Sequence, residues 1–183
     1  LAIVTTEGDT DGDGDYDELF IFGSRSITIW DANGNFVADT GATIEEQTAL
    51  ETTNCAPSEE LKDCSGFNSD NDENDSFDSR SDAKGPEPEG VVVGKVRGNY
   101  FAFVGLERVG GIMIFNVTDP ENPVYVDYVN NRDFDPDLDV EVEDVGDLGP
   151  EGLIFIKAGD SPIGEPLAMF PPMVAACLTW SDP

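Results

Sequence analysis

The chain has 183 residues, and its 39 acidic and 9 basic residues give a formal net charge of −30. This charge excludes nucleic acid and anionic membrane surfaces as simple partners, because both would repel the protein. The sequence contains no histidine, which excludes Ser-His-Asp triads, histidine general bases and histidine-containing zinc sites within this chain. No apolar run reaches the roughly 20 residues that span a bilayer, so we expect an acidic, folded protein without a transmembrane segment.

The first recognisable element is an acidic loop that begins at Asp9. Aspartates stand at its first, third and fifth positions and a glycine at its sixth, as in the first half of an EF-hand loop. Position twelve is Phe20 and not the bidentate glutamate, so Asp17 or Glu18 would have to complete the shell of oxygen ligands. The loop predicts a Ca²⁺ site, with a solvated acidic turn as the alternative, and its candidate ligands are Asp9, Asp11, Asp13, Asp17 and Glu18.

Most of the remaining chain consists of short apolar segments separated by Gly, Pro, Asn and Asp, which is typical of strands. One helix is predicted from Thr43 toward Leu50, where Thr43 and Glu46 form a capping box, and one helical turn over residues 58–62. Several strand segments are apolar on both faces, which requires a packed layer above and below them. The predicted strands are residues 18–22, 26–30, 35–38, 91–96, 100–104, 111–116, 124–129 and 152–157.

An internal repeat favours one architecture for these strands. Residues 85–91 recur in shortened form at 149–153, and residues 19–23 are echoed by 101–105. Four strands per unit in meander order are typical of a propeller blade, so we predict an all-β fold, a partial β-propeller of two to three blades, with a β-sandwich as the alternative. We predict a propeller segment at residues 1–166 and an atypical tail without a clear strand pattern at 167–183. Within the propeller segment, the predicted parts are a blade end at 15–40, an acidic insertion at 41–84, a full blade at 86–130 and the start of a further blade at 150–158.

The acidic insertion contains two features of interest. Cys55 and Cys64 are either the ends of a small disulfide loop or free thiols. Residues 68–82 are rich in Asp and Asn, which indicates either a metal-organised loop or an unstructured hydrophilic insertion. Arg80 would serve there as an internal counter-ion or as an anion clamp. The metal-ligand candidates in this loop are Asp70, Asp72 and Asp75.

Glu89 and Glu151 occupy equivalent positions in the repeat, each directly before a glycine and an apolar strand. In a propeller this strand lines the central channel, so equivalent glutamates would converge near the axis and could hold a metal. The alternative is a structural glutamate that accepts backbone N–H groups in its turn. Because carboxylates are hard oxygen ligands for Ca²⁺, which is plentiful outside cells, we expect an extracellular or cell-surface location, with any attachment to the cell through regions outside this chain.

The sequence resembles the choice-of-anchor I proteins over residues 7–166. The likeness is carried by residues 8–17, 67–82, 84–91, 104–112 and 130–134. It implies a secreted or surface-attached β-propeller, and some members of this family are described as atypical alkaline phosphatases.

The resemblance therefore implies a metal-dependent phosphoester hydrolase that acts on a small phosphoester. The expected metal is Ca²⁺, with a second divalent ion as an option. It would be held by Glu89, Glu151 and the acidic loop. Arg80 and Arg108 would neutralise the charge that develops on the phosphoryl group. The alternative is a non-catalytic, calcium-stabilised module for surface display or adhesion.

Overall fold

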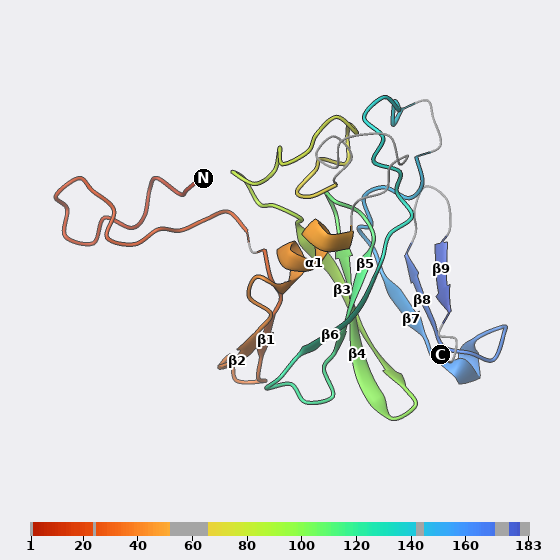
Figure 1. The fold of residues 1–183 in the computed structure, drawn as a ribbon. Helices are drawn as coiled ribbons and strands as arrows, with labels where there is room; N and C mark the ends of the chain where they lie inside the picture. Colours follow the sequence, from red (N-terminus) through yellow and green to blue (C-terminus); the bar gives the residue numbers. More distant parts are fainter. Residues whose placement is uncertain (1, 24, 52–65, 142–144, 171–175, 180–183) are drawn as a thin grey trace.

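The computed structural model describes residues 2–23, 25–51, 66–141, 145–170 and 176–179, and their fold is mostly β (Figure 1). The predicted strands 152–157 and 26–30 are present in shorter form, and the predicted helix from Thr43 is present as well. The predicted turn at 58–62 and the cysteine pair Cys55 and Cys64 lie outside the described residues. The elements in chain order are β1 (Thr28–Trp30), β2 (Phe36–Asp39), α1 (Thr43–Glu51), β3 (Pro88–Val96), β4 (Asn99–Leu106), β5 (Ile112–Asn116), β6 (Val124–Val129), β7 (Ile154–Ile156), a 3₁₀ turn (Ala158–Asp160), β8 (Leu167–Phe170) and β9 (Ala176–Thr179).

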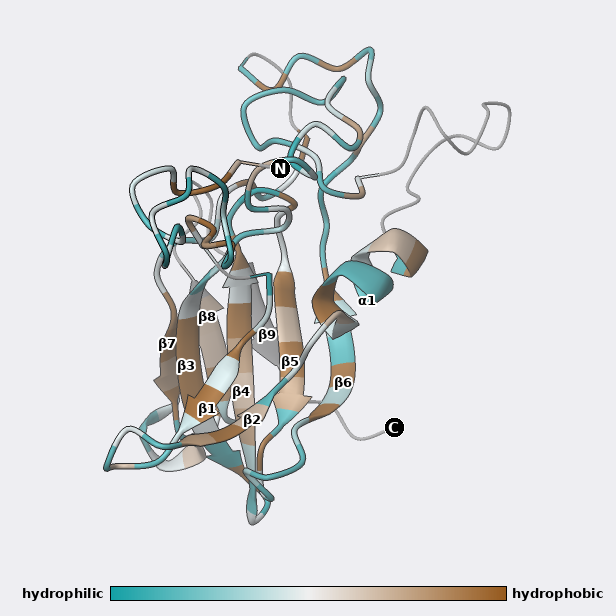
Figure 2. Cartoon of the chain, turned by 90° about the vertical axis from the view of Figure 1, so that its left-hand side faces the viewer, coloured by the Kyte–Doolittle hydropathy of each residue, from teal (hydrophilic) through white to brown (hydrophobic). Residues whose placement is uncertain are grey.

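The strands form three antiparallel sheets, in the orders β1-β2, β3-β4-β5-β6 and β7-β8-β9. The central sheet is a four-stranded meander in which each strand pairs with the next along the chain. Its strands confirm the four segments predicted between residues 91 and 129. Figure 2 shows the apolar strands of this sheet and the hydrophilic loops that gather at one of its ends.

The central sheet is covered on both faces, as its sequence requires. Alternate residues of β4 point to opposite sides. Ala102 and Val104 pack with Ile44 of α1 in one apolar cluster, and Ile27 lies against this cluster. Phe101 and Phe103 belong to a second cluster, which includes Ala168 of β8 and is contacted by Leu153 and Phe155.

The sheets on either side of this second cluster lie in close contact. Phe103 and Phe155 stack with their ring centroids 5.8 Å apart. Glycines in β3 permit this approach, because a Cβ at Gly94 would overlap the ring of Phe155 and a Cβ at Gly90 would lie 2.8 Å from the carbonyl oxygen of Glu151. The repeated segments that contain Glu89 and Glu151 are therefore neighbours in space.

The β1-β2 hairpin repeats the geometry of β5-β6. Thr28 pairs with Asp39 and Ile29 with Ala38, and a bulge precedes the pair of Trp30 and Phe36. In the central sheet, Met113 pairs with Tyr128 and Ile114 with Asp127, and a bulge precedes the pair of Phe115 and Tyr125. An extra residue at the same place in both hairpins supports the repeat that was inferred from the sequence.

Two segments differ from the sequence prediction. Residues 18–22 are irregular and not a strand: the N–H of Val4 donates to the carbonyl of Phe20 at 2.8 Å, but within the described residues β1 pairs with β2 alone. Residues 2–22 instead project from the body of the protein (Figure 1). The tail after residue 166, predicted to lack strands, contains β8 and β9, because β7 supplies a partner that fixes β8 in register with Ile154 opposite Met169.

Among the described residues, no helix has the length and apolarity needed to cross a bilayer.

Candidate functional site

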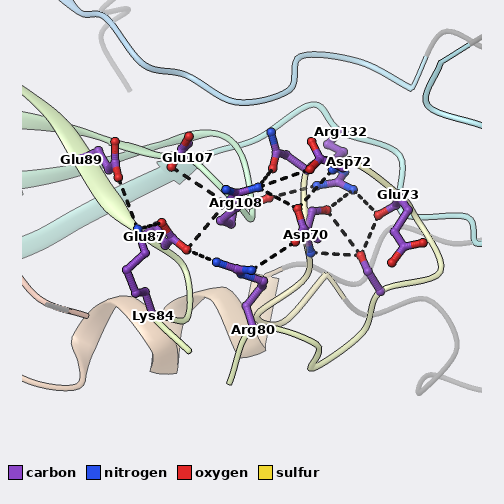
Figure 3. Close-up of polar contacts among 12 residues, drawn as sticks. Asp70, Asp72, Glu73, Arg80, Lys84, Glu87, Glu89, Glu107, Arg108 and Arg132 are labelled. Carbon is purple, nitrogen blue, oxygen red and sulfur yellow. Dashed lines mark hydrogen bonds and ion pairs between the residues drawn. The ribbon is translucent and has the colours of Figure 1, made fainter. Parts of the chain in front are cut away.

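The first candidate site is a cluster of charged side chains at the end of the central sheet where β3 begins and β4 ends (Figure 3). The loop of residues 66–87 supplies one side of it, and the two strands supply the other. This charged cluster consists of Asp70, Arg80, Lys84, Glu87, Glu89, Glu107 and Arg108.

Glu87 is the centre of the charged cluster. Its carboxylate is buried and accepts a hydrogen bond from Nη2 of Arg80 at 2.5 Å, and it forms an ion pair with Lys84. Burial alone would raise the pKa of Glu87, but the hydrogen bonds and positive charges of Lys84 and Arg80 lower it overall. Glu87 is therefore a carboxylate that stays ionised in a mostly buried position.

Asp70 links both arginines from the loop side. Its carboxylate lies 2.9 Å from Nη1 of Arg108 and 3.5 Å from Nη1 of Arg80. Burial raises the pKa of Asp70, while the N–H of Asp72 and the two guanidinium groups lower it by more. Arg80 and Arg108 are thus held between Asp70 and Glu87, with their charges matched by carboxylates of this chain.

Three glutamates meet at the strand side of the charged cluster. Carboxylate oxygens of Glu87, Glu89 and Glu107 all lie within 4.8 Å of one another. Burial and then the negative charge of Glu89 raise the pKa of Glu107, although Arg108 opposes this effect. A cation or a proton would relieve the repulsion among these groups.

The second candidate site is the acidic loop near the N-terminus. Carboxylate oxygens of Asp9, Asp11 and Asp17 lie within 4.8 Å of one another, and all three residues are exposed. The loop is shaped by its own side chains: Asp9 accepts from the N–H of Gly12 at 2.6 Å and from that of Gly14 at 3.1 Å. Gly12 and Gly14 both have positive φ, which glycine adopts without strain.

Asp17 closes this loop from its far side. It accepts hydrogen bonds from the N–H and the hydroxyl of Thr10, at 3.0 and 2.7 Å, and both bonds lower its pKa. Asp17 therefore stays charged beside Asp9 and Asp11. The donor set is made of hard carboxylate oxygens, which fits Ca²⁺ by its chemistry and supplies three of the roughly six to eight oxygens that the ion takes.

Comparison with known proteins places the chain in a family. The sequence model of the choice-of-anchor I domain matches residues 1–120, which is about two thirds of the chain. The chain belongs to the choice-of-anchor I domain family.

Two curated proteins share recognisable similarity with this choice-of-anchor I chain. Gigasin-3a of Magallana gigas is 31% identical over 117 residues, which cover 63% of this chain and 38% of that protein. A mesenchyme-specific cell surface glycoprotein of Strongylocentrotus purpuratus is 32% identical over 124 residues, which cover 60% of this chain and 14% of that protein. The chain therefore spans well under half the length of either relative, and no solved structure matches it.

The structure separates the predicted ligands of this choice-of-anchor I chain into those that converge and those that do not. In the N-terminal loop, Asp13 and Glu18 lie outside the group formed by Asp9, Asp11 and Asp17. The Oδ1 of Asp13 instead accepts the N–H of Asp15.

In the loop of residues 68–82, Asp70 binds arginines, Asp72 is exposed and lies 3.6 Å from Arg108, and Asp75 is exposed. Both repeated glutamates are exposed, but Glu89 belongs to the charged cluster, whereas Glu151 is absent from the carboxylate groups found among the described residues. Arg80 is an internal counter-ion in this arrangement.

Sequence reasoning missed Arg132, which holds the loop of residues 68–82 in place. Its side chain is completely buried, and its guanidinium donates to the carbonyls of Asp70 at 2.7 Å and Glu73 at 3.1 Å and to Oδ1 of Asn74 at 3.0 Å. It also lies over the ring of Phe134 at 4.9 Å. Burial lowers the pKa of Arg132 to about 10, which still leaves it protonated at neutral pH. Residues 68–82 are thus organised by an internal cation.

Lys84, Glu87 and Glu107 were also missed. Glu87 lies between Pro86 and Pro88, only two residues from Glu89, and this Pro-Glu-Pro pattern was the available signal.

Proposed function

We propose that this chain is part of a secreted or cell-surface β-propeller that is stabilised by calcium and acts as a display or adhesion module. Family membership, and similarity to a protein named as a cell surface glycoprotein, support the location. The propeller is supported by three antiparallel sheets, of which the second and third pack face to face, and by the register that the first and second sheets share.

The observation that carries the calcium proposal is the convergence of Asp9, Asp11 and Asp17 in a loop with the D-x-D-x-D-G pattern. These side chains would bind the ion, and Asp13, Glu18 or water would supply the remaining oxygens. A protein of net charge −30 gains from such binding, because a divalent cation also reduces the repulsion among its carboxylates.

The experiment is thermal unfolding with millimolar CaCl₂ and with EDTA in NaCl of matched ionic strength. Calcium is expected to raise the midpoint by preferential binding to the folded state, and the double variant Asp9→Asn, Asp11→Asn is expected to lose this gain. Asp160→Asn, which removes an exposed carboxylate at the 3₁₀ turn, serves as the matched control and should keep it. Equal midpoints in calcium and EDTA would refute the calcium proposal.

A second candidate function is metal-dependent hydrolysis of a small phosphoester at the charged cluster. It is favoured by the proximity of Glu87, Glu89 and Glu107, since a divalent ion bound there would act as a Lewis acid. Arg108, whose Nε lies 3.9 Å from Glu107, would stabilise negative charge on the substrate. The carboxylate partners of Arg80 and Arg108 compete with such a substrate, which is why we rank this function second.

The hydrolase proposal is tested by turnover of p-nitrophenyl phosphate with Ca²⁺, with Mg²⁺ and with EDTA. Activity is expected to require the metal and to fall at least about tenfold in Glu89→Gln but not in Asp160→Asn. No turnover in a sample that unfolds cooperatively would remove this candidate and leave the surface module intact.

A further inference from the structure

Residues 2–22 form an irregular arm that projects from the sheets (Figure 1). They contain four consecutive apolar residues with exposed side chains. The exposed fractions are 63% for Leu19, 46% for Phe20, 42% for Ile21 and 67% for Phe22. Val4 and Phe20 are already joined by a backbone hydrogen bond. A contiguous group of exposed apolar side chains usually marks a surface that binds another apolar surface.

Among the residues that the structure describes, β1 has an unpaired strand edge and β3 has an uncovered apolar surface. Within the described residues β1 is bonded along one edge only, by β2. Val91 and Val93 of β3 are 59% and 55% exposed, although they pair with Val104 and Ala102 and share their face of the central sheet. The part of this face that lies over β4 and β5 is covered by Ile27 and Ile44, and the part over β3 is not.

The repeat predicts how residues 2–22 would pack against this uncovered surface. Residues 19–23 correspond to 101–105 of β4, and residues 27–31 correspond to 112–116 of β5. Because Ala102 pairs with Phe115 in the central sheet, the equivalent pair is Phe20 with Trp30. The bulge shared by β1-β2 and β5-β6 supports this correspondence independently of the residue types.

The same correspondence predicts the contact across the sheets. Phe103 stacks on Phe155 of the following sheet, and these residues are equivalent to Ile21 and Val93. Ile21 would therefore cover Val93 as Phe103 covers Phe155.

We infer that residues 2–22 close against β1 as the two missing strands of the first sheet, with Phe20 opposite Trp30 and Ile21 over Val93. The inference rests on the repeat and on exposed apolar surface, and it is independent of calcium binding and of hydrolysis. Closure turns this arm toward β1, while Arg25 remains bound to Glu45 at 2.6 Å and the N–H of Ala2 to the carbonyl of Asp82 at 2.7 Å. The acidic loop then lies at the same end of the sheets as the β3-β4 turn at Arg97, opposite the charged cluster.

The first test is disulfide formation in a background that carries Cys55→Ser, Cys64→Ser and Cys177→Ser. Phe20→Cys with Trp30→Cys should form an intrachain disulfide, because directly opposed residues lie within the roughly 4.4–6.8 Å between Cα atoms that a disulfide needs. Phe20→Cys with Thr28→Cys is the matched control, since a diagonal neighbour lies about 7–8 Å away. Equal cross-linking of both pairs, or a disulfide found only between two chains, would overturn the inference.

The second test uses the unmodified chain, so that it does not depend on how the cysteine variants fold. Amides of residues 19–22 should exchange with deuterium at least about a hundredfold more slowly than in an unfolded peptide, as strand amides do. Exchange at the unfolded rate would overturn the inference.

Discussion

Glu87 combines burial, a negative charge and an uncommon backbone conformation. Its φ is 51°, a region that costs a residue with a side chain of order 1–3 kcal/mol. With the chain turned in this way between the two prolines, the carboxylate of Glu87 forms ion pairs with Arg80 and Lys84. Local strain in the backbone is therefore offset by electrostatics in the charged cluster.

Glu87→Gln should lower the free energy of unfolding by about 2–3 kcal/mol, because it leaves Arg80 and Lys84 without their buried partner. Glu89→Gln is the control: its side chain is 49% exposed, and we expect a change below about 0.5 kcal/mol. Urea unfolding measures both. Equal effects of the two substitutions would show that burial of Glu87 has no energetic consequence.

Glu107 should make the protein less stable as pH rises. Its pKa in the folded state lies above the unfolded value of about 4.3, so its protonated form favours folding and this contribution is lost as pH rises through the folded pKa. Glu107→Gln should therefore raise the free energy of unfolding at pH 7 by about 0.5–1 kcal/mol, with little change at pH 3.5. A loss of stability at pH 7 would contradict the raised pKa.

At the scale of single residues, the sequence predicted which residue types gather in the charged cluster better than it predicted which residues contact one another. It placed carboxylates at the start of β3 but favoured Glu89 over Glu87, because burial depends on how residues 66–87 fold over the strand. The role of Arg132 in holding residues 68–82 could not be predicted from the sequence for a related reason. Its partners Asp70, Glu73 and Asn74 are carbonyl and amide groups about 60 residues away, and backbone acceptors leave no trace in a sequence.

At the scale of elements, the central sheet was predictable because its strands are apolar on both faces and are separated by short turns. Residues 18–22 satisfy the same pattern, yet they form no strand. A strand requires a neighbour as well as suitable residues, and β8 shows the converse, since it forms on β7 despite an unpromising sequence.

Packing between β3 and β7 depends on glycine. Gly94→Ala should lower the free energy of unfolding by about 1–3 kcal/mol, because the added methyl group would overlap the ring of Phe155. Gly159→Ala is the control, since nothing lies within 4 Å of its added Cβ and its φ is not positive, and we expect a change within about 0.5 kcal/mol. Chemical denaturation checks both, and an unaffected Gly94→Ala protein would mean that the two sheets separate at little cost.

At the scale of the whole molecule, the net charge of −30 disfavours the compact state. Raising NaCl from 0.02 to 0.5 M shortens the screening length from about 20 to about 4 Å, so the unfolding temperature should rise in EDTA, without any specific ion. Thermal scans over this range measure the effect. A constant or falling unfolding temperature would indicate that the ion pairs of the charged cluster outweigh the general repulsion.

The scarcity of basic residues also determines where trypsin can cut this protein. Five of its nine lysines and arginines, namely Arg25, Arg80, Lys84, Arg108 and Arg132, are bound to residues of the 66–87 segment. The first 24 residues and the last 26 contain no lysine or arginine at all. We therefore expect trypsin to cut first at the exposed Lys95, Arg97 and Lys157, and to cut after Arg80 and Lys84 faster when this segment detaches, so that the rate of digestion there would report its opening.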